Sequence, residues 1–488
     1  MKITNSMAGK KEEFVPINKD EVKMYACGVT VYDLSHIGHA RQAIVYAMMT
    51  DYFRYKGYKV TYVRNYTDVD DKIIKRANEL GKNALEFSQE QILETEKDMK
   101  ALHVTEADIK TKASEYIPQI IKFVENLIEK GDAYATEKGD VYYSVKTFKE
   151  YGKLSHRKVD ELRNGVRIEV EEGKKDPVDF ALWKSAKPGE IYWESPWGKG
   201  RPGWHIECSA MILNTLGETI DIHGGGRDLL FPHHENEIAQ SEALTGKKLA
   251  NYWTHCGLIK INGEKMSKSL GNSLSIRDAL KMYNYEVIKY VLLSKHYATD
   301  MDIHDSDYKI AEEHMYYFYS TIKKMNEFIM ANAGDANGET LDNETLKNIV
   351  PKFIEVMDDD FNSALAISNL HIIFRDINNM MKTANKGNLQ IVANTLAKAL
   401  EDIKSVYKIL GFFEQELDEF INKMREKYLN KLNINTNEIE EQINKRAEAK
   451  KNKDYETADA IRAELDKKGI LLNDTKEGTT WDIKELYS

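Results

Sequence analysis

Cysteine and proline are both scarce in this chain of 488 residues, which contains 3 cysteines and 8 prolines. Three cysteines cannot build a disulfide framework of the kind that stabilises small secreted domains. No stretch approaches the ~20 uncharged apolar residues that a membrane-spanning helix requires. The residues from Met1 to Lys11 include lysines but no apolar segment typical of a signal peptide. We therefore expect a cytoplasmic protein, in a reducing environment, that does not enter a membrane.

An excess of positive charge is absent as well, because the formal net charge is -10. Nucleic acids bind clustered cations, but such a cluster can be local on an acidic protein. Lys445, Arg446, Lys450, Lys451 and Lys453 form one candidate cluster. On charge alone, a solvated helical face is the simpler interpretation of these residues.

The first clear pattern is strand, helix, strand. Val22 to Cys27 is typical of a short strand, the apolar residues between Gly38 and Lys56 recur with a helical period, and Tyr58 to Val63 is rich in β-formers. This βαβ unit predicts a parallel sheet with a right-handed crossover. Ligands of such sheets bind at the carboxyl ends of the strands, where Cys27 to His39 would lie.

The rest of the chain divides by pattern. We expect helices near 72–80, 84–102 and 118–130, a hairpin near 137–140, irregular structure over 145–204, helices after Asn251, a bundle over 312–413, and one charged helix over 438–468 before a short β-like end at Trp481. The predicted domains are two halves of a catalytic domain (1–120 and 196–255), a connective insertion between them (121–195), a connecting region (256–311), a helical bundle (312–431) and a small C-terminal domain (432–488).

Two short motifs suit a nucleotide triphosphate. His36, Gly38 and His39 stand at the predicted strand-to-helix turn, where a helix N-terminus attracts phosphate, two imidazoles add hydrogen-bond donors and a glycine admits a flat base. Lys265 and Lys268, in Lys265-Met-Ser-Lys-Ser269, can stabilise the charge that builds on a leaving pyrophosphate. Taken singly, the histidine motif could equally be an exposed polar helix start, and a lysine-rich loop is usually just exposed to solvent.

A third polar region lies between these motifs. Gly225 and Gly226 suit a backbone packed against a nucleotide, and Asp228 could accept from ribose hydroxyls, although an ordinary glycine turn is the plainer interpretation. His233 and Glu237 are four residues apart, so on a helix they would project from one face and could share a metal ion.

Pairs of cysteines with the spacing of a zinc ribbon are absent, since the cysteines are Cys27, Cys208 and Cys256. Any metal site must therefore be assembled from residues that are distant in the chain. Free cysteines are most often small buried hydrophobic residues, and spacing alone does not group Cys27 and Cys208 with His233 and Glu237.

Together these segments resemble the cysteinyl-tRNA synthetases. The unaltered motifs His36–His39 and Lys265–Ser269 are the paired signature of the class I aminoacyl-tRNA synthetases. The similarity continues over nearly the whole chain, in the family's order, through Tyr25–Asp33, Asn65–Lys72, Gly200–Met211, His223–Glu237 and Asp358–Asn362. The resemblance implies an α/β fold with a Rossmann-type parallel sheet split by an insertion, followed by a helical bundle and a small C-terminal α+β domain.

The resemblance also implies the chemistry. Activation of L-cysteine by ATP with Mg²⁺ and transfer to tRNA(Cys) are expected, with one Zn²⁺ per chain that selects the substrate thiol. The implied zinc ligands are Cys27, Cys208, His233 and Glu237, and Cys256 is interpreted as structural. Thr67, Trp204 and His223 would line the amino-acid pocket, His36, His39, Lys265 and Lys268 would act on the phosphates, and Gly38, Gly225, Gly226 and Asp228 would hold the nucleotide. We expect a monomer whose C-terminal domain reads the anticodon, with Trp481 as a stacking candidate or a core residue.

Three alternatives stay open at this point. The cysteine-dependent ligase of mycothiol synthesis resembles the catalytic half but should lack the segment from Glu438 to Ser488. A small-molecule nucleotidyltransferase would not need the glycine-rich segment, the lysine motif and a bundle together. A non-catalytic tRNA-binding relative is expected to have lost one of the two signature motifs.

Overall fold

The computed structural model describes residues 1–159, 173–261, 263–265, 274–475 and 478–487. It divides into two compact units, which are described separately. Unit 1 comprises Met1–Tyr285, Leu292–Ile303 and Glu355–Ala364, and unit 2 comprises Glu286–Val291, His304–Ile354 and Leu365–Ser488. No helix of the described residues is long and apolar enough to cross a lipid bilayer.

A five-stranded parallel sheet forms the centre of unit 1, as the βαβ pattern predicted. Its strand order is β11-β10-β3-β4-β5, and all of its neighbouring strands are parallel. The strands are β3 (Glu21–Thr30), β4 (Lys59–Thr67), β5 (Ile109–Lys112), β10 (Ile220–Gly226) and β11 (Ala250–Cys256). Because β10 and β11 follow β5 only after more than a hundred residues, the sheet is split by an insertion, which confirms the predicted fold class.

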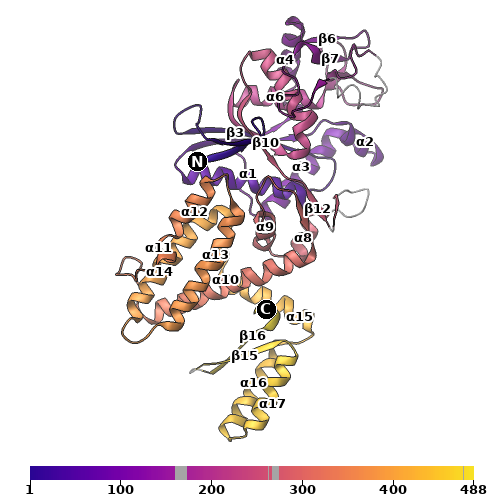
Figure 1. Cartoon of the computed structure of the whole chain (residues 1–488). Helices are drawn as coiled ribbons and strands as arrows, with labels where there is room; N and C mark the ends of the chain where they lie inside the picture. Colours follow the sequence, from indigo (N-terminus) through magenta and orange to yellow (C-terminus); the bar gives the residue numbers. More distant parts are fainter. Residues whose placement is uncertain (160–172, 262, 266–273, 476–477, 488) are drawn as a thin grey trace. The chain divides into compact units, whose positions relative to one another are not determined.

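The helix that connects β3 to β4 is buried on nearly all sides. This helix, α1 (Ile37–Tyr55), lies against the sheet, and Tyr46 on it donates to the carbonyl oxygen of Thr254 at 2.8 Å (Figure 1). Arg41, also on α1, is buried and donates to the carbonyl oxygens of Gly257 at 2.9 Å and Thr299 at 2.7 Å. A helix that is apolar all round belongs inside the protein, and these bonds fix its first turn at the carboxyl edge of the sheet.

The insertion contains regular structure that the sequence did not indicate. Strands β6 (Ala133–Ala135), β7 (Val141–Tyr143), β8 (Phe180–Ser185) and β9 (Gly200–Pro202) form an antiparallel sheet. The hairpin between β6 and β7 was predicted, but the expectation of irregular structure over 145–204 is wrong for β8 and β9. Trp183 on β8 is fully buried in a cluster of apolar side chains, which explains why such short strands are stable.

The chain after Asn251 is also not wholly helical, contrary to expectation. Strand β11 continues to Cys256, and β12 (Ile259–Ile261), β13 (Glu264–Lys265) and β14 (Met301–Ile303) form a small sheet. The other elements of unit 1, or shared with unit 2, are β1 (Lys2–Asn5), β2 (Lys10–Glu13), α2 (Asp71–Glu79), α3 (Ala84–Ala101), α4 (Ile117–Glu129), α6 (Trp204–Thr215), α7 (Glu235–Thr245), α8 (Ile276–Met282), α9 (Tyr285–Leu293) and α12 (Ile349–Asp358).

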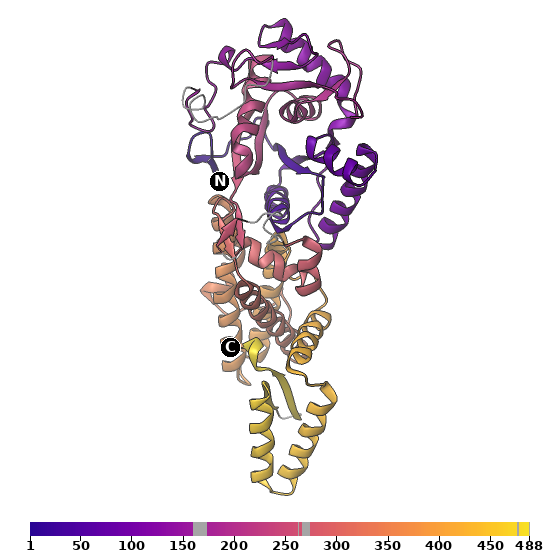
Figure 2. The same ribbon diagram turned by 90° about the vertical axis from the view of Figure 1, so that its right-hand side faces the viewer.

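Unit 2 is mostly helical, as predicted. Its helices are α10 (Asp305–Ala331), α11 (Glu344–Lys347), α13 (Ser363–Thr383), α14 (Leu389–Tyr407), α15 (Leu417–Leu432), α16 (Thr436–Lys451) and α17 (Tyr455–Lys467). The single helix expected over 438–468 is in fact two, because Lys453 has a positive φ of 62° and the Asp454 side chain caps α17. Figure 2 shows these two helices side by side, next to the hairpin of β15 (Ile470–Thr475) and β16 (Gly478–Ile483).

Candidate functional site

A cavity of about 330 Å³ opens at the carboxyl ends of the parallel strands in unit 1. Parallel α/β sheets bind their ligands at this edge. The cavity is lined by Cys27, Gly28, Val29, Thr30, Tyr32, His36, Gly38, His39, Gln42, Asn65, Thr67, Lys72, Trp204, Cys208, Gly226, Asp228, Leu229, His233, Cys256, Gly257, Leu258 and Ile259.

Four potential metal ligands from three parts of the chain meet at the floor of this cavity. The Sγ atoms of Cys27 and Cys208 are 3.7 Å apart, and Cys27 Sγ lies 3.4 Å from Glu237 Oε1. His233 Nε2 is 2.9 Å from the same carboxylate oxygen. One ligand atom from each of the four residues lies within 4.8 Å of the other three, and all four side chains are buried. The structure thus brings together the four residues that the resemblance named.

The local backbone explains how Cys27 reaches this point. The pairing of β3 with β4 shifts register between Ala26 and Val29, which is a β-bulge. Bulges re-aim side chains and often stand next to functional sites. Gly28 is required there, because a Cβ atom on Gly28 would lie 1.6 Å from the carbonyl oxygen of Asn65.

The side chains of the cluster shift one another's pKa values. Burial would raise the pKa of Glu237, but His223 and His233 outweigh burial and hold this pKa well below its usual value. Burial alone would lower the pKa of His233, but Glu237 and Cys208 outweigh burial and raise this pKa to about 10. A hydrogen bond from Cys27 lowers the pKa of Cys208 to about 6. The cluster therefore favours a carboxylate on Glu237 and a thiolate on Cys208, with protonated His233 as the balancing positive charge.

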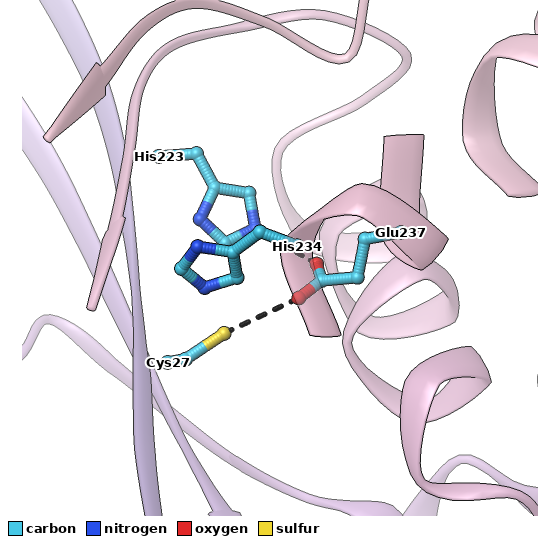
Figure 3. A group of neighbouring side chains, drawn as sticks. All are labelled: Cys27, His223, His234 and Glu237. Carbon is cyan, nitrogen blue, oxygen red and sulfur yellow. Dashed lines mark hydrogen bonds and ion pairs between the residues drawn. The ribbon is translucent and has the colours of Figure 1, made fainter. Parts of the chain in front are cut away.

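A second group of potential ligands overlaps the first. Figure 3 shows Cys27, His223, His234 and Glu237, whose ligand atoms are also mutually close. His223 Nε2 lies 2.8 Å from Glu237 Oε2, and His234 Nδ1 lies 2.8 Å from His255 Nε2. Of the two groups, the first contributes three cavity-lining side chains, and the second contributes only Cys27. A ligand in the cavity therefore meets the first group.

The signature histidines lie at the first turn of α1. His36 caps the helix, with its Nδ1 accepting from the backbone N–H of Gly38 at 3.1 Å, and its ring stacks on that of His39 with the centroids 3.7 Å apart. Both rings line the cavity. This turn therefore brings two imidazoles and the N-terminus of a helix together at the cavity.

The glycine-rich segment ends β10 at the same cavity. Gly226 and Asp228 line the cavity, whereas Gly225 does not. A Cβ atom on Gly225 would lie 2.9 Å from Leu229 Cδ1 and 3.0 Å from His234 Cε1, so Gly225 provides room for packing behind the wall. Cys256, at the end of β11, belongs to neither group of potential ligands, and burial raises its pKa to about 11.

Of the three residues that were expected to line the amino-acid pocket, Thr67 and Trp204 line the cavity and His223 does not. Thr67 ends β4 and is not a helix cap, because Asp70 caps α2 instead. Trp204 stacks on His233 with ring centroids 4.3 Å apart. His223 is fully buried and stacks on Trp253 at 4.5 Å, so its contact is with Glu237 rather than with the cavity.

Only the first residue of the lysine motif, Lys265, belongs to the part of the chain that the structure describes. The backbone of Lys265 lies in β13 and pairs with Lys260. Lys268 lies outside the residues that the structure describes.

Three further residues of the site were not predicted. His205 Nδ1 lies 3.0 Å from His233 Nδ1, Glu207 is fully buried with its pKa raised well above its usual value by burial, and Lys72 lines the cavity. The sequence did contain a signal for His205 and Glu207, because these two ionisable residues stand among the apolar residues of helix α6. Nothing in the pattern distinguishes Lys72 from an ordinary surface lysine.

Comparison with known proteins agrees with this geometry. The family described as "tRNA synthetases class I (C) catalytic domain" matches residues 13–313, and the DALR domain matches residues 352–414. The cysteine--tRNA ligase of Thermodesulfovibrio yellowstonii is 49% identical over 99% of this chain and 100% of its own length. That of Geobacter metallireducens is 47% identical over 99% of this chain and 100% of its own.

Solved structures share the fold at low identity. The methionyl-tRNA synthetase of Mycobacterium tuberculosis, in complex with methionyl-adenylate, has a TM-score of 0.62 at 14% identity, covering 86% of this chain and 94% of that one. The Agrobacterium radiobacter K84 agnB2 LeuRS complex with tRNA and LeuAMS also has a TM-score of 0.62, at 10% identity, covering 84% of this chain and 86% of that one.

The split parallel sheet with its cavity at the carboxyl edge, and the family match over most of unit 1, define the catalytic fold of a class I tRNA synthetase. At nearly half identity over the full length of both chains, the resemblance seen in the sequence is confirmed. The chain belongs to the cysteine--tRNA ligase family.

Proposed function

We propose that this chain activates L-cysteine with ATP, forming cysteinyl-adenylate and pyrophosphate, and transfers the cysteinyl group to tRNA(Cys). The observation that carries this proposal is the cluster of Cys27, Cys208, His233 and Glu237 at the floor of the cavity, beside the first turn of α1. A small amino acid and a nucleotide can thus occupy one cavity, with the side chain of the amino acid directed at the cluster.

The donor set of the cluster suits zinc. Two thiols, one imidazole and one carboxylate are ligand types that Zn²⁺ accepts, and the soft thiolates select it over Mg²⁺ or Ca²⁺. The lowered pKa values of Cys208 and Glu237 favour the ligating forms of these residues. When bound, zinc would supply a Lewis-acidic centre that prefers a thiol sulfur to a hydroxyl oxygen, which is the one difference between cysteine and serine. A pocket that works by shape alone discriminates poorly between near-isosteres.

In the first step the carboxylate of cysteine attacks the α-phosphate of ATP, which is bound with Mg²⁺, and pyrophosphate leaves. His36 and His39 contact the phosphates at the start of α1, and Gly38 allows close approach of the nucleotide. Lys265 and Lys268 stabilise the charge on the leaving pyrophosphate. Positioning and charge stabilisation carry most of the catalysis in such chemistry.

The remaining residues orient the two substrates. Gly226 and Asp228 hold the adenosine, and Gly225 provides the space behind them. Thr67 and Trp204 border the amino acid, and His223 fixes Glu237 from behind. In the second step a terminal hydroxyl of the tRNA attacks the adenylate carbonyl, the bond from this carbonyl to the phosphate breaks, and AMP leaves as the cysteinyl ester forms. Unit 2, with its DALR domain, would contribute to tRNA binding.

Cysteine-dependent exchange of pyrophosphate into ATP tests the first step without tRNA. We expect exchange with cysteine and at least ~100-fold less with serine, because hydroxyl oxygen is the weaker zinc ligand. Cys208→Ser should lose bound zinc, as measured by atomic spectroscopy, and should lose exchange with it. Unchanged metal content in Cys208→Ser, or equal exchange with serine, would contradict the proposal.

The lysine motif provides a second test that does not involve the proposed zinc ligands. Lys268→Ala should slow pyrophosphate exchange by about 100-fold or more, the size expected for removing one preorganised charge from the transition state. Its zinc content should stay at the wild-type level. Near-normal exchange would remove Lys268 from the mechanism.

A further inference from the structure

Lys72 lines the cavity and is the one lysine that does so among the residues that the structure describes. It is the second residue of α2 and stands just beyond the end of β4. Its Nζ lies 5.4 Å from the centroid of the Tyr32 ring, and Tyr32 lines the same cavity. A cation over the face of a tyrosine is held without being neutralised.

The carboxylates nearest in sequence to Lys72 are engaged with other groups. Asp71 pairs with Lys184 at 2.9 Å and with Arg201 at 2.6 Å. Asp70 caps α2 by accepting from the backbone N–H of Lys72. Among the residues that the structure describes, no aspartate or glutamate lies within ion-pair distance of Lys72 Nζ, and the lysine is exposed. Its charge is therefore available to a ligand.

The position of this lysine is not explained by the stability of α2. The N-terminus of a helix carries a partial positive charge, and a cation there costs roughly 0.3–1 kcal/mol. An acidic residue would serve the fold better. A lysine at this place, facing a cavity, instead adds to the attraction of the helix N-terminus for an anion.

Two more cations continue from Lys72 along the exposed side of α2. Lys75 and Arg76 follow at the i+3 and i+4 positions, which share a helix face with Lys72, while Ile73, Ile74 and Ala77 are buried. Lys75 has no ion-pair partner among the described residues, and Arg76 pairs only with its neighbour Glu79, at 3.0 Å. The three residues form a row of positive charge that leads away from the cavity; we call it the α2 basic row.

The sheet order separates this row from the nucleotide side of the cavity. Gly226 and Asp228 follow β10, and Gly257 to Ile259 follow β11, whereas Lys72 follows β4 on the other side of β3. Lys72 follows the strand that ends at Thr67 of the proposed amino-acid pocket, and β3 lies between that strand and β10. An anion at the α2 basic row would approach the adenylate from its amino-acid side.

We propose that Lys72, with Lys75 and Arg76, binds the backbone phosphates of the single-stranded 3′ end of the tRNA and guides its terminal ribose to the adenylate. This inference rests on the proposed function, because it assigns a surface to the second substrate of that reaction. A row of cations that begins inside the cavity and continues outward fits a chain of phosphates better than it fits the compact triphosphate of ATP.

The experiment compares the two steps of the reaction in the full-length enzyme. Pyrophosphate exchange without tRNA reports on ATP, and single-turnover transfer from preformed adenylate to a tRNA(Cys) transcript reports on the 3′ end. The variants are Lys72→Gln, the charge-conserving Lys72→Arg, and Lys72→Gln/Lys75→Gln/Arg76→Gln. Lys59→Gln, at the opposite end of β4, removes a matched exposed lysine whose nearest carboxylate, Glu21, is 3.5 Å away.

We expect Lys72→Gln to lower kcat/KM for tRNA about tenfold, and its loss in transfer to exceed its loss in exchange at least fivefold. Lys72→Arg should restore most of the transfer rate. The salt dependence of log kcat/KM should become shallower by about 0.7 for each phosphate contact removed, up to about 2 for the triple variant. Lys59→Gln should behave as wild type.

Equal losses in exchange and transfer would assign Lys72 to ATP and overturn the inference. Transfer within twofold of wild type in the triple variant, or a loss in Lys59→Gln equal to that in Lys72→Gln, would overturn it too. A wild-type enzyme that does not charge tRNA(Cys) would instead refute the proposed function, so the two failures are distinct.

Discussion

Among the buried carboxylates of unit 1, Glu237 and Asp360 have surroundings that differ in a way that separates ligand binding from structure. Glu237 lies among His223, His233 and Cys27 at the floor of the cavity. Asp360 accepts from the backbone N–H of Thr4 at 2.7 Å and from the Tyr297 hydroxyl at 2.8 Å, and it pairs with His296 at 3.3 Å. Glu237 is thus surrounded by groups that themselves bind metals, whereas hydrogen-bond donors from distant segments hold Asp360.

The two carboxylates differ in the groups that compensate their buried charge. A buried charge is costly unless it is paired and hydrogen-bonded. At Asp360 the donors compensate the charge fully, and they tie Glu355–Ala364 to the N-terminal strand and to the loop after α9. At Glu237 the compensation comes from His223 and His233. The pKa of His233 is itself raised to about 10, and a metal ion would displace its proton. The first arrangement stabilises the fold, and the second has the side-chain types and the proximity of a metal-ligand set.

Replacing Glu237 should have the largest effect on activity. Glu237→Gln keeps the size of the side chain but removes the charge, so we expect loss of bound zinc and a fall of at least ~100-fold in cysteine-dependent pyrophosphate exchange, by analogy with the cost of disturbing metal-site residues. Metal content and exchange are measured on the same preparation. Glu242→Gln on the same helix is the control, because it removes the charge that pairs with Lys153 but keeps an oxygen that can accept from the backbone N–H of Leu249. Full zinc occupancy in Glu237→Gln would place the metal elsewhere.

Replacing Asp360 should affect stability more than activity. Asp360→Asn should lower the free energy of unfolding of unit 1 by about 2–3 kcal/mol, because the buried donors around this position lose their charged acceptor. Urea unfolding followed by tryptophan fluorescence measures this, since every tryptophan except Trp481 lies in unit 1. Zinc content should stay unchanged. A loss of zinc equal to that of Glu237→Gln would erase the distinction between the two carboxylates.

The contribution of Asp360 to the free energy of unfolding has a predictable pH dependence. Burial would raise the pKa of Asp360, but hydrogen bonds from His296 and Thr4 outweigh it and leave this pKa below its ordinary value. The stabilising effect is therefore complete above the unfolded-state pKa of about 3.9 and is lost as the pH falls through the lower, folded-state pKa. The stability difference between wild type and Asp360→Asn should shrink as the pH is lowered below about 4. A difference that is constant from pH 7 to pH 3 would contradict this.

The smallest effect is expected in unit 2, at a pair closer to the surface. Arg446 is buried and forms two hydrogen bonds with Asp474, at 2.7 and 2.9 Å, and Asp474 is partly exposed. Arg446→Met should weaken the β15–β16 hairpin by about 1 kcal/mol, with no change in cysteine activation. Hydrogen exchange of the hairpin amides measures it. Lys450→Met removes a more exposed contact to the same carboxylate and should destabilise the hairpin less than Arg446→Met. A larger destabilisation by Lys450→Met would contradict the expectation that the buried contact contributes more.

The sequence predicted the parts of the fold that depend on local pattern. The period of α1 and the β-rich segments on either side of it were sufficient for the parallel sheet. Strands β8 and β9 were missed because they are only three to six residues long and are stabilised by partners distant in the chain, such as the cluster around Trp183. The break between α16 and α17 was missed because a single residue with positive φ, Lys453, interrupts a continuous helical composition.

The site was predictable only where a known family supplied the grouping. His36 and His39 stand together in the sequence, but the meeting of Cys27, Cys208 and Glu237 depends on the order of the strands and on a β-bulge, which no spacing reveals. Resemblance grouped them, and the structure confirms that they meet. Lys72, His205 and Glu207 became visible only when the cavity placed them.

The most direct test of the central claim is X-ray absorption at the zinc edge of the purified enzyme, with and without substrate. We expect about two sulfur ligands in the free enzyme, from Cys27 and Cys208, and a third when cysteine is added but not when serine is added. A sulfur count that cysteine leaves unchanged would contradict the account.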